Sequence, residues 1–195
     1  MLSHSLLSNG GNHVYDREEN DFYATEPAAA DLLEKTGETA NYIWECACGQ
    51  GHLAKRFEEL GHFVFSSDKI DRGFGERFDF INDEFETSHI DPYFYEYFDI
   101  VTNPPYKLAA EFIKKGYELL RPKRKLCLFL KLTFLESVAR DKLFEQYPVS
   151  RIHVCRKRIK CAKNGDFSKV QSSPTCYAWF VWEKGYSGPT IIDRV

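Results

Sequence analysis

The segment Asn103-Pro104-Pro105-Tyr106 has the residue types that most clearly suggest chemistry. Two successive prolines fix φ twice and remove two backbone N–H groups, so the loop is stiff and its carbonyls lack local partners. The Asn103 side-chain oxygen and the Pro104 carbonyl could together accept both hydrogens of a planar amino group. Such a nitrogen is a poor nucleophile, and hydrogen bonds that strengthen as it becomes tetrahedral favour the transition state. Tyr106 offers a flat face on which the ring that carries the amino group can stack.

A second set of candidate residues surrounds a glycine turn. Glu45, Gly49 and Gly51 join an apolar segment to a helix-forming segment, and Asp68 ends the next apolar segment. The glycines allow a sharp turn and a close approach of the backbone to a bound molecule, and the Asp68 carboxylate could bind a ribose diol. Gly49-x-Gly51-x-x-Ala54 also fits the dinucleotide fingerprint, so an NAD-dependent oxidoreductase is an alternative for this segment alone. That alternative leaves the Asn-Pro-Pro-Tyr segment unexplained.

These residues need a scaffold that brings them to one edge. Apolar segments predict strands at residues 42–46, 62–66, 78–81, 98–102, 126–132, 149–155 and 176–182. Helices are expected at 25–35, 52–60, 108–120 and 135–147, the first with Thr25 as its N-cap. This alternation indicates an α/β fold with a mainly parallel sheet and helices on both faces. Ligands bind such sheets at the carboxyl ends of strands, where Gly49, Asp68, Asp79 and Asn103 are expected.

Length and composition are those of an ordinary globular protein, with 195 residues, 43% of them hydrophobic and 28% charged. We expect residues 1–21 to be a flexible segment and residues 22–195 to form a single domain. No apolar run approaches a membrane-spanning length and no export signal is recognisable, so we expect a cytoplasmic protein without a membrane partner. The six cysteines include no C-x2-C pair, which favours buried free thiols over a metal site.

Charge is divided unevenly along the chain. Residues 1–100 contain 7 Lys/Arg and 21 Asp/Glu, whereas residues 101–195 contain 19 and 8. Most of the basic excess lies within residues 121–163. A basic region of this kind favours a nucleic-acid partner, because phosphate neutralisation dominates such affinity. The alternative is a solvated charged face.

Five pieces of the sequence, in order, resemble the class I S-adenosylmethionine-dependent methyltransferases, specifically the group that methylates adenine N6 in DNA. They are Phe22–Pro27 (FYATEP), Glu45–Gly51 (ECACGQG), Asp68, Asp79–Ile81 and Asn103–Tyr106. The resemblance implies the Rossmann-like fold of that family, with a seven-stranded, mostly parallel sheet, an antiparallel last strand and helices on both faces. It also implies S-adenosyl-L-methionine as the cofactor and no metal.

By the same resemblance, Thr25 and the glycine-turn backbone would hold the methionine part of the cofactor, and Glu45 would favour its ammonium group. Asp68 would bind the ribose hydroxyls, Asp79 the adenine amino group, and Phe80 would pack on that ring. The full set of predicted cofactor residues is Phe22, Thr25, Glu45, Ala47, Gly49, Gly51, Asp68, Asp79 and Phe80. The predicted catalytic residues are Asn103, Pro104, Pro105 and Tyr106.

The tetrapeptide leaves the methyl acceptor open, because enzymes acting on RNA adenine or on protein glutamine carry it or close variants. The basic second half and the FYATEP segment favour a nucleic acid, DNA before RNA, with a base flipped out or single-stranded. A non-enzymatic alternative is a methyltransferase-like nucleic-acid-binding module. The predicted substrate contacts are Arg156, Lys157, Arg158 and Lys160 on phosphates and Phe167 on the far face of the base. Phe167 could instead cap the core. We expect no separate target-recognition domain, by analogy with small orphan enzymes of phages.

Overall fold

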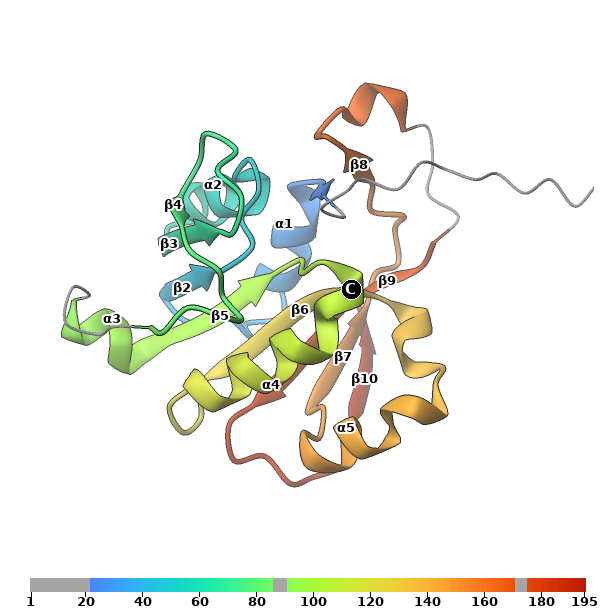
Figure 1. The fold of residues 1–195 in the computed structure, drawn as a ribbon. Coiled ribbons are helices and arrows are strands. Elements are labelled where there is room, and N and C mark those ends of the chain that lie inside the picture. The colour runs from blue at the N-terminus through green and yellow to red at the C-terminus, as the bar shows by residue number, and fades with distance from the viewer. Residues whose placement is uncertain (1–21, 86–90, 171–174) are drawn as a thin grey trace, which may run out of the picture.

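A computed structural model of the chain describes residues 22–85, 91–170 and 175–195, so residues 1–21, predicted to be flexible, lie outside it. The strands of the central sheet are β2 (Tyr42–Glu45), β3 (Phe63–Asp68), β4 (Glu76–Arg77), β5 (Phe98–Thr102), β6 (Lys125–Lys131), β7 (Arg151–Val154), β9 (Tyr177–Glu183) and β10 (Ile191–Arg194). The α-helices are α1 (Ala28–Glu34), α2 (His52–Glu59), α3 (Pro92–Tyr97), α4 (Ala109–Leu119) and α5 (Asp141–Gln146) (Figure 1).

The strands are hydrogen-bonded in the order β10-β7-β9-β6-β5-β2-β3-β4. All neighbouring pairs are parallel except those of β9, which runs antiparallel to both β6 and β7. The predicted α/β class and the mostly parallel sheet are therefore confirmed. Two details of the prediction are wrong. The described part of the chain has eight strands in this sheet, because β10 adds an edge strand parallel to β7, and the antiparallel strand is not the last one.

Alternating side chains of the central strands supply two separate apolar cores. Trp44, Ile100 and Leu126 belong to a cluster that also contains Phe112 of α4. Their sequence neighbours on the same strands join another cluster, formed with residues of α1 and α2. Each strand is thus covered on both sides, as its unbroken apolar sequence requires. The prediction of helices on both faces is confirmed.

Several predicted elements have different bounds. Residues 78–81 form no strand; the third parallel strand is the short β4, at residues 76–77. Residues 92–97, for which no helix is expected from the sequence, form α3, where Asp91 accepts hydrogen bonds from two first-turn N–H groups and proline begins the helix. The helix expected over 135–147 is reduced to α5, preceded by the 3₁₀ turns η3 (Leu132–Leu135) and η4 (Val138–Arg140).

Thr25 is not a helix N-cap. It ends the strand β1 (Tyr23–Thr25), and α1 begins after Pro27 with no side-chain cap. β1 pairs antiparallel with β8 (Cys161–Lys163), so that Thr25 lies opposite Cys161. This two-stranded sheet stands beside α1, outside the central sheet (Figure 1). The pairing connects β1 to the long segment between β7 and β9.

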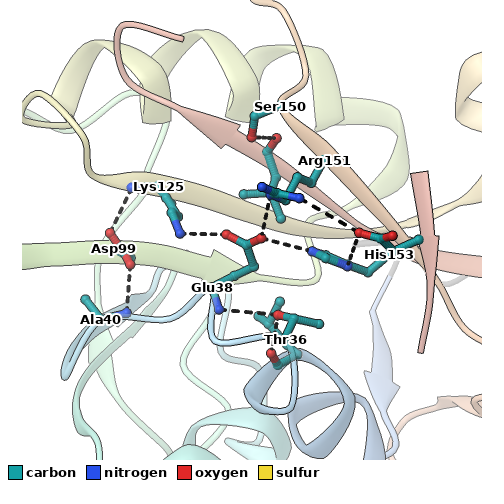
Figure 2. A network of polar contacts seen from close by, with 11 residues as sticks. Thr36, Glu38, Ala40, Asp99, Lys125, Ser150, Arg151 and His153 are labelled. Atoms are coloured by element: carbon teal, nitrogen blue, oxygen red, sulfur yellow. Dashed lines mark hydrogen bonds and ion pairs between the residues drawn. The ribbon is translucent and has the colours of Figure 1, made fainter. Parts of the chain in front are cut away.

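A polar network closes the amino end of the central sheet (Figure 2). The buried Glu38 lies 2.6 Å from Lys125 Nζ, 3.1 Å from Arg151 Nε and 3.2 Å from His153 Nε2. Lys125 and Arg151 begin β6 and β7, so Glu38 joins the loop before β2 to both strands. Among the described residues, no helix has the length and apolar character needed to span a bilayer.

Candidate active site

A cavity of about 490 Å³ opens at the carboxyl ends of the parallel strands. The predicted residues that line it are Phe22, Thr25, Glu45, Ala47, Asp68, Asp79, Phe80, Asn103, Pro104, Pro105 and Tyr106. All four predicted catalytic residues and most of the predicted cofactor residues, from segments between residues 22 and 106, therefore line one cavity. Gly49 and Gly51 shape the turn beside it without lining it.

The glycine turn packs against two aromatic rings. Gly49 has φ +56° and Gly51 has φ +78°, a region that other residues adopt at a cost. A Cβ on Gly49 would lie 2.2 Å from the Phe22 ring, and one on Gly51 would lie 2.4 Å from the Phe74 ring. The turn is held from outside by Asp68, whose Oδ2 accepts the Gly49 N–H at 2.8 Å. The sequence therefore places glycine where both the backbone conformation and the packing exclude a side chain.

Glu45 is a buried carboxyl that lines the cavity and is 2% exposed. It accepts a hydrogen bond from the backbone N–H of Ala54, in the first turn of α2. Burial raises the pKa of Glu45 well above its usual value, and the nearby carboxylates of Asp68 and Glu58 raise it further. Its Oε2 has no hydrogen-bond partner in the described structure. A buried, half-satisfied carboxyl of this kind is suited to a cationic ligand.

Asp79 also lines the cavity. Its carboxylate lies 2.9 Å from Lys69 Nζ and accepts a hydrogen bond from Asn82 Nδ2 at 2.8 Å. Burial acts to raise the pKa of Asp79, but the hydrogen bonds from Lys69 and Asn82 outweigh it, so the pKa is lowered. Next to it, Phe80 is 2% exposed and stacks on Phe112 at 4.9 Å. Phe80 is thus mainly a core residue, with part of its surface on the cavity.

Asn103 is held by its amide nitrogen. Nδ2 donates to Thr25 Oγ1 at 2.8 Å and to the Tyr23 carbonyl at 3.2 Å. A main-chain carbonyl can only accept, so the nitrogen must face Tyr23 and the oxygen must face away. Asn103 Oδ1 is buried and has no partner within the described structure. The site therefore presents an acceptor that the protein itself leaves unsatisfied.

Tyr106 begins the 3₁₀ turn η2 (Tyr106–Leu108) and is packed more tightly than the sequence suggests. Its hydroxyl donates to Cys161 Sγ at 3.7 Å, and its ring lies 6.3 Å from that of Tyr177. The ammonium of Lys131 lies 4.8 Å from the ring centre. Burial, with Cys161 and Tyr177 close by, raises the pKa of Tyr106 well above its usual value, so it stays a neutral phenol.

The predicted substrate residues do not line this cavity. Arg156, Lys157 and Arg158 are exposed on the segment after β7, and the Lys160 backbone is bonded to Glu26, next to β1. Phe167 is half-buried in the 3₁₀ turn η5 (Phe167–Lys169), and its ring centre lies 5.3 Å from that of His52 in an edge-to-face arrangement. Phe167 is absent from both apolar cores, so the structure does not support the alternative that it caps the core.

Other cavity residues were not selected from the sequence. Arg72 lines the wall, its guanidinium lies 4.2 Å from the centre of the Phe22 ring, and its buried Nε has no partner among the described residues. Lys69 and His52 also line the cavity. No motif marks them: Lys69 and Arg72 lie in the loop after β3, whose path the sequence does not indicate, and His52 begins α2 directly after the glycine turn. Among the described residues, no group of three or more His, Cys, Asp or Glu could hold a metal ion.

No protein-family model and no curated protein sequence matches this chain. Solved structures do match. A protein from Listeria monocytogenes, assigned as a class I S-adenosylmethionine-dependent methyltransferase, aligns with a TM-score of 0.56 and 14% identity, over 86% of this chain and 63% of its own. An assigned RNA methyltransferase from Pyrococcus horikoshii aligns with a TM-score of 0.57 and 15% identity, over 83% and 86%.

A third similar structure is the 1,6-didemethyltoxoflavin-N1-methyltransferase of Burkholderia thailandensis, solved with its substrate and S-adenosylhomocysteine. It aligns with a TM-score of 0.50 and 13% identity, over 81% of this chain and 76% of its own. This chain thus spans less than two thirds of the Listeria protein and more of the other two. The antiparallel β9 also departs from the all-parallel dinucleotide fold that an NAD enzyme would have. The chain has the Rossmann-like class I methyltransferase fold.

Proposed function

We propose that this protein is an S-adenosylmethionine-dependent methyltransferase that acts on the N6 amino group of adenine in DNA. The observation that carries this proposal is the buried Asn103 Oδ1, which has no partner while its own amide nitrogen is fixed. An unsatisfied buried acceptor is costly, and substrate binding would satisfy it. A substrate amino group has N–H donors that can bond to Asn103 Oδ1.

The catalytic segment would bind and orient the nitrogen. Asn103 Oδ1 and the Pro104 carbonyl accept its two hydrogens, and these bonds strengthen as the nitrogen becomes tetrahedral. Bound S-adenosylmethionine supplies an electrophilic methyl group. The methylated nitrogen would release its extra proton to water, and the sulfur would keep the electrons of the broken carbon–sulfur bond. Tyr106, a neutral phenol in this site, contributes ring contact rather than a base.

The carboxylates at the same edge fit the cofactor. Glu45 has one oxygen without a partner and would ionise beside an ammonium group, which offsets the burial that raises its pKa. Asp68 binds one backbone N–H through each oxygen, Gly49 N–H at 2.8 Å and Ile70 N–H at 2.9 Å, and a carboxylate has further acceptor sites for ribose hydroxyls. These donors and acceptors line one cavity with Asn103.

The choice of DNA is supported by the exposed cations that follow β7 and by the resemblance of residues 22–27 to DNA adenine enzymes. The segment between β7 and β9 is joined to the cavity wall through the β1–β8 pair, which places it beside the cavity. RNA adenine is the second candidate, favoured by the similarity to the assigned RNA methyltransferase. Both substrates require the target base to leave a stacked strand.

One experiment tests the activity and the acceptor together. Wild-type protein is incubated with labelled S-adenosylmethionine and, separately, with duplex DNA, single-stranded DNA, RNA and protein, and the modified unit is identified after digestion. Asn103→Ala should abolish transfer while the cofactor still binds in calorimetry. Asn41→Ala is the matched control, since Asn41 is exposed and outside the cavity. If the label is found in RNA or on protein glutamine, that acceptor replaces DNA adenine as the proposed substrate. Retained turnover in Asn103→Ala would refute the role of Asn103.

A further inference from the structure

The orientation of the Asn103 amide depends on a residue that the sequence assigns to the cofactor. Thr25 is 3% exposed and lies in β1, opposite Cys161 of β8. Its hydroxyl oxygen accepts the Asn103 Nδ2–H at 2.8 Å, and its side chain also hydrogen-bonds Cys161. A hydroxyl has one hydrogen, so it accepts from Asn103 and donates to the sulfur.

We propose that Thr25 is a positioning residue for methyl transfer: together with the Tyr23 carbonyl, it fixes the Asn103 amide so that Oδ1 faces the substrate amino group. This inference rests on the proposed function and deepens it. An asparagine side chain can otherwise turn over, which would present two donors to the substrate instead of an acceptor. A substrate amino group cannot bond to those donors. The Thr25 hydroxyl and the Tyr23 carbonyl therefore together hold the amide in the orientation in which the site can work.

The strand β1 connects this contact to the predicted substrate-binding segment. β1 is only three residues long and joins the central sheet nowhere; its backbone pairs with β8. β8 belongs to the segment that carries the exposed cations, and the Glu26 N–H donates to the Lys160 carbonyl at 2.9 Å. The predicted substrate-binding segment is thus connected to the Asn103 amide through the β1–β8 pair. The strand β1 therefore contacts both the predicted substrate-binding segment, through β8, and the Asn103 amide, through Thr25.

This role differs from cofactor binding in what it predicts. If Thr25 positions Asn103, then Thr25→Val, which keeps the shape and removes the hydroxyl, lowers kcat about tenfold to 100-fold, as loss of alignment does. The dissociation constant for S-adenosylmethionine then stays within twofold. Thr25→Ser restores kcat, because it restores the acceptor. If Thr25 instead binds the methionine part, Thr25→Val weakens cofactor binding, and kcat measured at saturating cofactor is unchanged.

The experiment combines calorimetry with S-adenosylmethionine, DNA methylation kinetics and NMR of protein labelled with ¹⁵N-asparagine. The Asn103 side-chain amide is identified by its loss in Asn103→Ala. We expect its hydrogens to be protected from exchange in the wild type and in Thr25→Ser, and unprotected in Thr25→Val. Thr25→Ala is measured alongside, in case the valine variant is poorly folded. Thr190→Val, which removes a hydroxyl bonded to the Val149 carbonyl at the other end of the sheet, is the control.

The outcomes distinguish failure of the proposed methyltransferase function from failure of the positioning role of Thr25. If the wild type methylates no nucleic acid, the proposed function fails, and the NMR measurement alone decides whether Thr25 holds the amide. An unprotected Asn103 amide in the wild type would overturn the positioning role. So would a tenfold weaker cofactor affinity in Thr25→Val with unchanged kcat. A fall in kcat with unchanged cofactor affinity and lost protection supports it.

Discussion

Replacing Glu38 by glutamine should destabilise the fold by an amount that depends on pH. Glu38 is 9% exposed and bonded to Lys125, Arg151 and His153 (Figure 2). Burial acts to raise its pKa, but hydrogen bonds from His153 and Lys125 outweigh it and lower the pKa from 4.5 to about 2. At about 1.36 kcal/mol per pH unit, this fall corresponds to about 3 kcal/mol of folding free energy.

The sign follows from the lowered pKa. A carboxyl that binds its proton less readily when folded stabilises the fold fully above its unfolded pKa, here 4.5, and loses that contribution as pH falls towards 2. Urea unfolding of wild type and Glu38→Gln should therefore differ by about 3 kcal/mol at pH 7, with the difference shrinking at pH 4 and again at pH 3. Glu59→Gln is the control, because Glu59 is 63% exposed in its pair with Arg56. A difference that is the same at every pH would refute the reasoning.

Three further changes test the cavity and the exposed cations. Gly51→Ala should weaken S-adenosylmethionine binding in calorimetry and lower stability by about 1–2 kcal/mol, because φ is +78° and a Cβ would meet the Phe74 ring; unchanged affinity would contradict it. Asp68→Asn should raise the cofactor dissociation constant about tenfold, since it removes a charged acceptor at the glycine turn; a value within twofold would count against that contact. Charge reversal at Arg156 and Lys157 should reduce the slope of log affinity for DNA against log salt by about 2, and an unchanged slope would exclude this surface.

The sequence was sufficient to predict the central sheet and the composition of the cavity. Buried parallel strands are continuous apolar runs, so β2, β5 and β6 can be recognised locally. Polar residues directly after such runs must meet at the carboxyl edge of the sheet, which is why Asp68 and Asn103 share one cavity. Glycine at the turn follows from the same local geometry.

The elements that were missed from the sequence were missed for different reasons. β1 reads locally as the start of a helix, yet Tyr23 pairs with Lys163 and Thr25 with Cys161, more than 130 residues away. β10 is short and exposed along its length, so no apolar run marks it. For α3 a signal was present: Asp91 before Pro92 is a typical helix start, obscured by the aromatic residues that follow.

The number of basic residues in the sequence overstates how many can contact phosphates in the folded protein. Lys125 and Arg151 belong to the basic stretch, but they pair with Glu38 at the amino end of the sheet, away from the cavity. The ammonium of Lys131 lies 4.8 Å from the centre of the Tyr106 ring. Arg156 and Lys157 are exposed on the segment that leads from β7 to β8, the strand paired with β1 beside the cavity. The nucleic-acid affinity proposed here should therefore depend on few charges, and its salt dependence should be shallower than the charge count of residues 121–163 implies.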